Sequence, residues 1–312
     1  MTKNNEARKQ WDARQGTVQS SDCLAQKRTV PLFWGTIRLL AKGRNPHLGK
    51  PLFYLSKVSF GYSSAEPIFR DISLEIKVGE RVSLLGANGS GKSTLLKILC
   101  GLIFPQQGCF KAYGQQINEK SMEDESFARD YHRKVGFIFQ NSDVQLFTTR
   151  VWDEIAYGPL QMGLNQAQVR QRVEDVLDML QIQNLRERSP HRLSGGEKKK
   201  VAVASVLVLN PEVLILDEPT SGLDPKTERW LVDLLLELNR QGRTIIVSTH
   251  NLELAHILAT RSLVLSESHE LICDGYTQDI LANREILMAV NLIDEYCHVH
   301  GEKEHVHRYT HG

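Results

Sequence analysis

Residues 81–102 read RVSLLGANGSGKSTLLKILCGL. A short apolar run ends in a glycine-rich loop and continues with helical spacing, which predicts a buried strand, a loop and a helix. The loop, Gly86–Ser93, matches the pattern G-x-x-x-x-G-K-[ST] of phosphate-binding loops, and it stands in the strand–loop–helix context that this pattern requires.

The loop has the chemistry of a nucleotide site. Glycines at 86, 89 and 91 allow backbone N–H groups to curl around phosphate oxygens, and the following helix directs its positive end at the same anion. Lys92 is expected to reach the β- and γ-phosphates of ATP, and Ser93 to offer its hydroxyl to Mg²⁺. The predicted nucleotide-binding residues of this loop are Gly86, Asn88, Gly89, Ser90, Gly91, Lys92, Ser93 and Thr94.

A second segment, VLILDEP at 213–219, supplies two carboxylates. Its apolar residues predict a buried strand that carries Asp217 to its carboxyl end, where ligands gather in parallel sheets. Asp217 is expected to hold Mg²⁺, commonly through water. Glu218 is the candidate general base for the attacking water, and a positioned base contributes about 10²–10⁴ in rate.

The rest of the chain alternates between strand and helix patterns. Strands are expected at 51–62, 68–76, 135–140 and 243–250, hairpins at 105–120 and 262–275, and helices between 151 and 188 and around 227–242. In the 151–188 block, Val169, Val173, Val176, Leu177 and Leu180 form one apolar stripe. Strands interleaved with helices imply an α/β fold with a parallel core sheet, interrupted by a helical block at 141–205.

Composition narrows the class of protein. Of the 312 residues, 41% are hydrophobic and 24% charged, and the formal net charge is +1, so the chain is not a general nucleic-acid binder. Residues 1–50 hold ten basic and three acidic residues and are interpreted as a basic arm, either a solvated tail or a contact for anionic lipid or RNA. Five dispersed cysteines indicate reduced thiols and a cytosolic compartment. The most apolar stretch, residues 30–41, is too short to cross a bilayer.

Six short motifs together resemble the nucleotide-binding subunits of ATP-binding-cassette (ABC) transporters. The phosphate loop and DEPTSGLD at 217–224 are joined by LSGGE at 193–197, STHN at 248–251, Gln140 in FIFQN and Tyr62 in VSFGY. They occur in the family's order, near its spacing, over residues 51–275. The resemblance implies a P-loop ATPase with an antiparallel β subdomain and an inserted α-helical subdomain, at 141–205.

The resemblance also implies roles for individual residues. Tyr62 should stack on adenine, Gln140 should sense Mg²⁺ and the attacking water, and His250 should contact the γ-phosphate. The turn Ser194, Gly195 and Gly196 should cap the ATP held by a second ABC ATPase chain, and Asp224 should lie at the interface between the two. This role suits a capped helix start, whose free N–H groups favour an anion. Glu197 departs from the family's commoner glutamine, and we expect hydrolysis to survive this.

The segment after Gln140, NSDVQLFTTRVWDEIAYGPLQMGL at 141–164, resembles energy-coupling-factor importers of the cobalt and nickel type. In that family it lies beside a groove that receives coupling helices of a transmembrane protein. The implied complex contains that protein and a substrate-binding membrane subunit, with this chain peripheral on the cytoplasmic face. An importer of a vitamin or another small solute remains the alternative.

The C-terminal end, CHVHGEKEHVHRYTHG at 297–312, is rich in histidine. Imidazole suits Ni²⁺, Co²⁺, Cu²⁺ and Zn²⁺, so His298, His300, His305 and His307 are candidate ligands for a transition metal, with Cys297 or Glu304 available to complete the shell. The alternative is a polar tail with adventitious metal affinity.

Two other classes of ABC ATPase fit less well. Chromosome-structuring ATPases insert long coiled coils between their motifs, and this sequence has no such coiled coil. Ribosome-associated ABC proteins carry two cassettes, whereas this sequence has one set of motifs. The predicted organisation is a basic arm at 1–50, an ABC ATPase domain at 51–275, and a C-terminal extension at 276–312.

Overall fold

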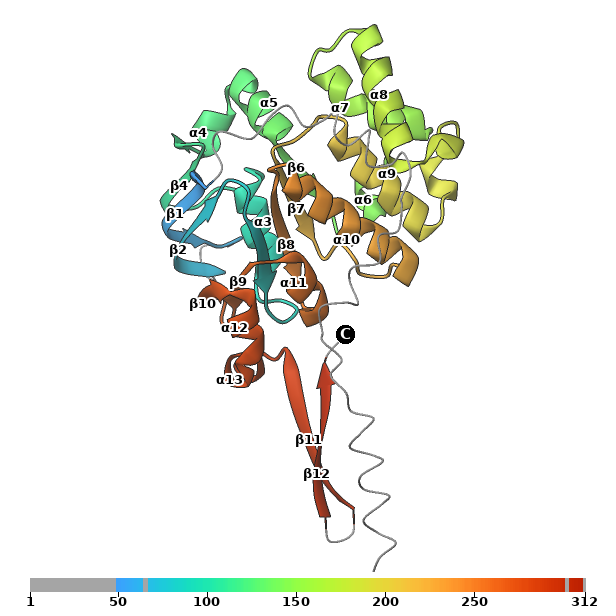
Figure 1. Cartoon of the computed structure of the whole chain (residues 1–312). Coiled ribbons are helices and arrows are strands. Elements are labelled where there is room, and N and C mark those ends of the chain that lie inside the picture. The colour runs from blue at the N-terminus through green and yellow to red at the C-terminus, as the bar shows by residue number, and fades with distance from the viewer. Residues whose placement is uncertain (1–48, 64–66, 301–302, 311–312) are drawn as a thin grey trace, which may run out of the picture.

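The computed structural model describes residues 49–63, 67–300 and 303–310, with side chains up to Ile293 (Figure 1). Nearly all of the basic arm, including the apolar stretch 30–41, lies outside the described residues, as does His311.

A six-stranded sheet forms the centre of the molecule, in the order β10-β9-β3-β8-β7-β6. Every neighbouring pair is parallel except β9 and β10, which form the predicted hairpin. Strands β7 and β8 are buried along their whole length because both faces of the sheet are covered. The strands are β3 (Arg81–Leu85), β6 (Val135–Ile138), β7 (Val213–Asp217), β8 (Thr244–Thr249), β9 (Arg261–Leu265) and β10 (Leu271–Tyr276).

A second, four-stranded antiparallel sheet has the order β2-β1-β4-β5. Its inner face contributes Phe53, Phe69 and Phe110 to a core shared with helix α3 (Lys92–Leu99) and with β3 and β7. This sheet therefore supports the loop between β3 and α3. Its strands are β1 (Pro51–Phe60), β2 (Phe69–Lys77), β4 (Gln107–Ala112) and β5 (Gln115–Gln116).

The chain between β6 and β7 is mostly helical. Its helices pack on one another, at a distance from the antiparallel sheet (Figure 1). All five residues of the predicted stripe on α8, Val169 to Leu180, are buried. The α/β architecture with its antiparallel sheet and helical insertion is thus confirmed, whereas the domain boundaries stay a prediction. These helices are α6 (Ser142–Gln145), α7 (Val151–Gln161), α8 (Gln166–Leu180) and α9 (Gly195–Leu207), with 3-10 turns at Gln183–Leu185 and Pro190–Arg192.

The remaining helices flank strands of the central sheet or lead towards the C-terminus. Two follow β7 and β8, namely α10 (Pro225–Arg240) and α11 (Leu252–Leu258). The sequence patterns had not indicated α4 (Glu119–Met122), α5 (Glu125–Lys134), α12 (Thr277–Ala282), α13 (Arg284–Ala289) or the terminal hairpin of β11 (Ile293–His300) and β12 (Lys303–Thr310). In the described ranges, no helix has the length and apolarity that a bilayer crossing requires.

Candidate nucleotide-binding and hydrolysis site

The loop between β3 and α3 has the backbone of a phosphate cradle. Gly89 and Gly91 have φ angles of 86° and 96°, a region that residues with a Cβ rarely adopt. Gly91 is the N-cap of α3, and a Cβ there would lie 2.9 Å from the ring of Phe69. The antiparallel sheet therefore presses directly on the start of the helix, which fixes where its free N–H groups point.

Lys92 lies inside this loop and is 6% exposed. Its Nζ donates to the carbonyl oxygens of Gly86 (2.8 Å) and Ala87 (3.1 Å), and it is 3.5 Å from Oε1 of Glu218. Ser93 follows in the first turn of α3, and the hydroxyl of Thr94 is 3.5 Å from that of Tyr62. Tyr62, the predicted adenine-stacking residue, is thus next to the helix and is 61% exposed.

The ends of β7 and β8 bring the acids to the loop. Asp217 pairs with Ser248 in the parallel ladder, and the Ser248 hydroxyl donates to the Asp217 carboxylate. The same hydroxyl accepts from the backbone N–H of Glu218 at 3.0 Å. His250, just beyond β8, has its Nδ1 3.1 Å from Oε1 of Glu218. Glu218 therefore lies between the ammonium of Lys92 and the imidazole of His250.

Gln140 follows β6, which pairs with β7, so it stands at the same edge of the sheet as the two acids. A buried side chain holds its backbone: Nζ of Lys199, from α9, donates to the carbonyl oxygens of Phe139 (3.1 Å) and Gln140 (3.0 Å). Burial lowers the pKa of Lys199 to about 8, and the nearby Asp217 carboxylate opposes this shift.

Two more side chains join the segment after Gln140 to α9. The amide nitrogen of Gln145 donates to the carbonyl oxygen of Ala202 at 2.8 Å, and Lys198 pairs with Asp143 at 2.6 Å. Residues 139–145 are therefore bonded to α9, whose N-cap is Ser194.

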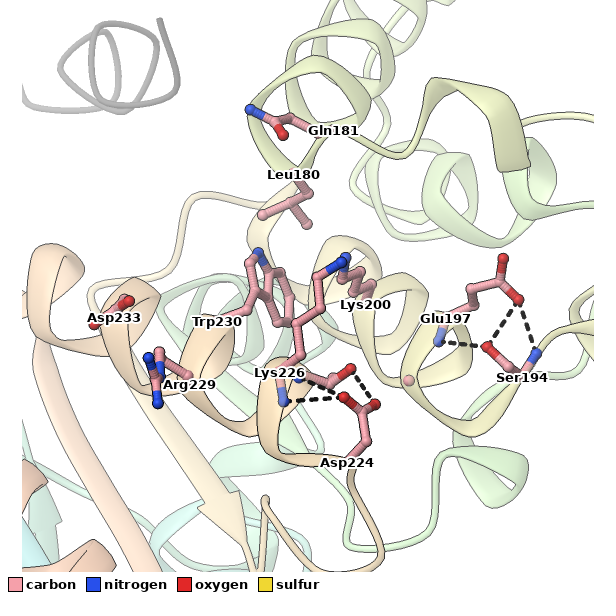
Figure 2. A pocket seen from close by; sticks show the side chains of 12 residues that line it. Leu180, Gln181, Ser194, Glu197, Lys200, Asp224, Lys226, Arg229, Trp230 and Asp233 are labelled. Carbon is pink, nitrogen blue, oxygen red and sulfur yellow. Dashed lines mark hydrogen bonds between the residues drawn. The ribbon is translucent and has the colours of Figure 1, made fainter. Parts of the chain in front are cut away.

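Ser194 caps α9 in a reciprocal capping box with Glu197 (Figure 2). The Glu197 carboxylate accepts from both the backbone N–H and the hydroxyl of Ser194, each at 2.9 Å. These two bonds lower the pKa of Glu197 from its ordinary value. The acidic residue that departs from the commoner glutamine thus fixes the conformation of the serine beside it.

The start of α9 touches the start of α10 at Gly196. A Cβ on Gly196 would lie 2.6 Å from Oγ1 of Thr227, so only glycine fits this junction. Thr227 donates through its hydroxyl to Asp224 at 2.6 Å, and Asp224 also accepts from two backbone N–H groups as the N-cap of α10. Asp224 therefore caps a helix of its own chain, next to Ser194.

The two helix starts line an open cavity of about 570 Å³ (Figure 2). Ser194, Gly196 and Asp224 line it together with Trp230, over whose ring lies the ammonium of Lys200. None of its lining residues comes from the phosphate loop. The structure thus brings Lys92, Asp217, Glu218 and His250 together, but it leaves the Ser194 turn in a separate pocket.

Several residues of the site could not be recognised from sequence. Ser248 contacts both acids, but in the sequence it is only the first residue of STHN, and its hydroxyl has no distinctive spacing there. Lys199 was hidden in a run of three lysines that suggests a solvated face. The sequence carries one weak indication that Lys199 is buried: it precedes the buried Val203 by one helical turn and so lies on the same face of the helix.

The residues present fit an anion with a bound cation. The buried hydroxyl of Ser90 has no hydrogen-bond partner among the described atoms, and a Cβ on Gly89 would meet nothing within 4 Å, so there is open space beside Gly89. The donors around it are backbone N–H groups and an ammonium, which suit phosphate. The hydroxyl of Ser93 and the carboxylate of Asp217 are oxygen ligands of the kind that Mg²⁺ prefers.

Comparison with known proteins agrees with this geometry. Residues 69–221 match the family model of the ABC transporter. A Methanosarcina acetivorans protein, provisionally named an ABC transporter ATP-binding protein, is 46% identical over 83% of this chain and 98% of its own length. The nickel import ATP-binding protein NikO of Rhodobacter capsulatus is 44% identical over 78% and 96%. An energy-coupling factor transporter ATP-binding protein of Methanospirillum hungatei is 41% identical over 78% of this chain and 60% of its own.

Two solved structures share the fold. The cbiO1 protein of Clostridium perfringens, part of the ABC transporter complex cbiONQ, has a TM-score of 0.67 at 33% identity, covering 78% of this chain and 95% of its own. A dimeric ATP-binding cassette in a post-hydrolysis state with ADP and phosphate has a TM-score of 0.65 at 28% identity, covering 72% and 99%. Shared motifs, site and fold lead to one conclusion: the chain belongs to the ATP-binding subunits of ABC transporters, and it hydrolyses ATP.

Proposed function

We propose that this chain powers a membrane importer of nickel or cobalt, of the energy-coupling-factor type. The phosphate loop would hold the β- and γ-phosphates of ATP, with Lys92 balancing their charge. Bound Mg²⁺, held by Ser93, Gln140 and Asp217, would neutralise charge on the phosphates. Glu218 would take the proton of the attacking water, and His250, 3.1 Å from it, would orient the carboxylate and contact the γ-phosphate.

The site is proposed to be completed by a second ABC ATPase chain. Ser194 and Gly196 line a pocket to which none of this chain's own phosphate-loop residues contributes. The N–H groups at the start of α9 suit an anion, and they would meet the γ-phosphate held by the partner. Binding of ATP would then join two chains, and hydrolysis would release them.

An exposed apolar patch supports a transmembrane partner. The patch consists of Val144, Phe147, Tyr157 and Leu160, whose exposed fractions lie between 45% and 69%. The ring centroids of Phe147 and Tyr157 are 4.9 Å apart, and Leu160 lies one helical turn beyond Tyr157. We propose that this patch receives a coupling helix of the membrane protein, which would place the chain at the cytoplasmic face of the membrane.

The observation that supports this function most is the continuous connection between the patch and the site. The buried carboxylate of Glu154 accepts from the backbone N–H groups of Phe147 and Thr148, at 3.0 and 2.8 Å. Gln145 and Lys199 then join the same segment to α9 and to Gln140. A partner that moves the patch would act on both the hydrolysis site and the Ser194 turn.

The choice of nickel or cobalt is supported by the nickel import relative and the histidine-rich end of the chain. The energy-coupling factor relative carries no metal in its name, so a vitamin or another small solute is the second candidate. Transport of the two kinds of substrate separates these possibilities.

The test is uptake of radiolabelled nickel, cobalt and a vitamin such as biotin by cells expressing the chain with its membrane partners. We expect metal uptake that Glu218→Gln abolishes, since this variant should bind ATP, accumulate as a dimer and lose about 10²–10⁴ in hydrolysis rate. Uptake of the vitamin in place of metal would contradict the substrate. Normal hydrolysis in Glu218→Gln would contradict the assigned base.

The patch is tested by a second pair of variants in the same cells. Phe147→Ala with Tyr157→Ala should leave ATP binding intact but remove the chain from the membrane fraction. Ile257, an apolar residue on α11, is as exposed as Tyr157, so Ile257→Ala is the control and should remain with membranes. Equal recovery of both variants in membranes would exclude the patch as the docking site.

A further inference from the structure

The C-terminal hairpin gives the histidines of the C-terminal tract defined positions relative to one another. Strands β11 and β12 pair antiparallel over their full length, beyond α13 (Figure 1). In the ladder, His298 is directly opposite His305, Tyr296 is opposite His307, and His300 is opposite Lys303.

This register assigns the histidines to one face. Directly opposite residues of an antiparallel pair belong to the same face, and faces alternate along each strand. His298, His300, His305 and His307 therefore occupy positions of a single face. Cys297, opposite Val306, and Glu304, opposite Val299, occupy positions of the other face. Neither Cys297 nor Glu304, the two candidates for an extra ligand, occupies a position of the histidine face.

The spacing of these positions suits a shared ion. Opposite residues in such a ladder have Cα atoms about 4.5–5.5 Å apart, and alternate residues of one strand are about 6.6–6.8 Å apart. Metal–imidazole bonds of about 2.0–2.1 Å require nitrogen atoms to approach one another closely, which side chains at opposite and diagonal positions can achieve. Elsewhere, among the side chains described up to Ile293, no three His, Cys, Asp or Glu are arranged to hold a metal ion.

We propose that this face of the hairpin is a site for a divalent transition-metal ion, with the His298–His305 pair as its centre and His300 and His307 as additional ligands. Imidazole prefers Ni²⁺, Co²⁺, Cu²⁺ and Zn²⁺ over Mg²⁺ and Ca²⁺. The site is separate from the ATP site and does not depend on what the complex transports.

The experiment is calorimetric titration of the full chain with NiCl₂ above pH 7, where imidazole is largely neutral, with MgCl₂ as the control ion. His298→Ala with His305→Ala should lower the affinity for Ni²⁺ by more than about tenfold, the smallest loss expected even for a supporting group. The matched pair Cys297→Ser with Glu304→Gln, on the other face, should leave the affinity unchanged. ATP hydrolysis, measured on each variant, should be retained and reports on folding.

A composition-preserving variant separates this site from adventitious binding. His298→Val combined with Val299→His keeps the number of histidines but moves one to the opposite face. The proposed site predicts a loss of affinity equal to that of His298→Ala alone. If the exchanged variant binds Ni²⁺ as tightly as the unmutated chain, the tract binds metal only through its composition and the proposal is wrong.

Discussion

Glu218 combines chemistry with backbone strain. Its φ angle is 40°, a value that costs a residue with a side chain about 1–3 kcal/mol. The conformation is held because its N–H is bonded by both the hydroxyl and the carbonyl oxygen of Ser248, at 3.0 and 3.1 Å. It turns the carboxylate from the strand axis towards Lys92 and His250, which is the geometry that a base needs beside a phosphate loop.

Lys199 has a structural role that titration can reveal. Burial lowers its pKa to about 8, below the ordinary value of about 10.4 in an unfolded chain. Between these values the unfolded chain binds the proton more tightly, so this group makes the free energy of unfolding rise with pH. Lys199→Met should therefore show a smaller rise between pH 8 and 10 than the unmutated chain, measured by urea unfolding.

The neighbouring Lys198→Met provides the control, because its ammonium pairs with Asp143 nearer the surface. It should keep the pH slope of the unmutated chain. Lys199→Met should also slow ATP hydrolysis, since the carbonyl oxygens of Phe139 and Gln140 lose their donor. An unchanged slope in Lys199→Met would show that its amine is not held in the low-dielectric interior.

The junction of α9 and α10 depends on one glycine. A Cβ at 196 would displace Thr227 and break its bond to Asp224, so Gly196→Ala should destabilise the chain by about 1–3 kcal/mol, as overpacking does. Gly195→Ala meets no atom within 4 Å and should be tolerated. Chemical denaturation of the two variants measures the difference. Equal stability would contradict the close contact between the helices.

The elements that sequence predicted are those whose burial follows a pattern. Strand β7 holds a continuous apolar run before Asp217, and the stripe on α8 repeats with helical spacing. Helix α5 was not predicted because Tyr131 is the one residue of its ten that is buried, so the helix has no buried apolar stripe. Strands β11 and β12 were not predicted because their polar sequence does not alternate regularly between apolar and polar residues.

The sequence predicts which residues form the site better than it predicts the contacts that hold them in place. Motifs identified Lys92, Asp217, Glu218 and His250, since phosphate chemistry restricts those positions to few residue types. The burial of Lys199 depends on how α9 packs against β6, and the orientation of both acids depends on Ser248. These are tertiary relations between distant segments, which spacing along the chain does not record.

Across the subunit, the pocket at the Ser194 turn is lined by no residue of the phosphate loop, so the proposed mechanism requires two chains. The most direct measurement mixes two variants that each disable one half of the site. Lys92→Met removes the phosphate ligand. Gly195→Asp adds a carboxylate where Cβ meets only open space, so it should fold, while its negative charge occupies the positive end of α9 and repels the partner's phosphate.

Each variant alone should hydrolyse almost no ATP, at a protein concentration where the unmutated chain is active. In a mixed pair, the intact phosphate loop of one chain meets the intact Ser194 turn of the other, and phosphate release should recover to a level that neither variant reaches. If the mixture stays as inactive as its components while the unmutated chain turns over, each chain completes its own site and the two-chain mechanism is contradicted.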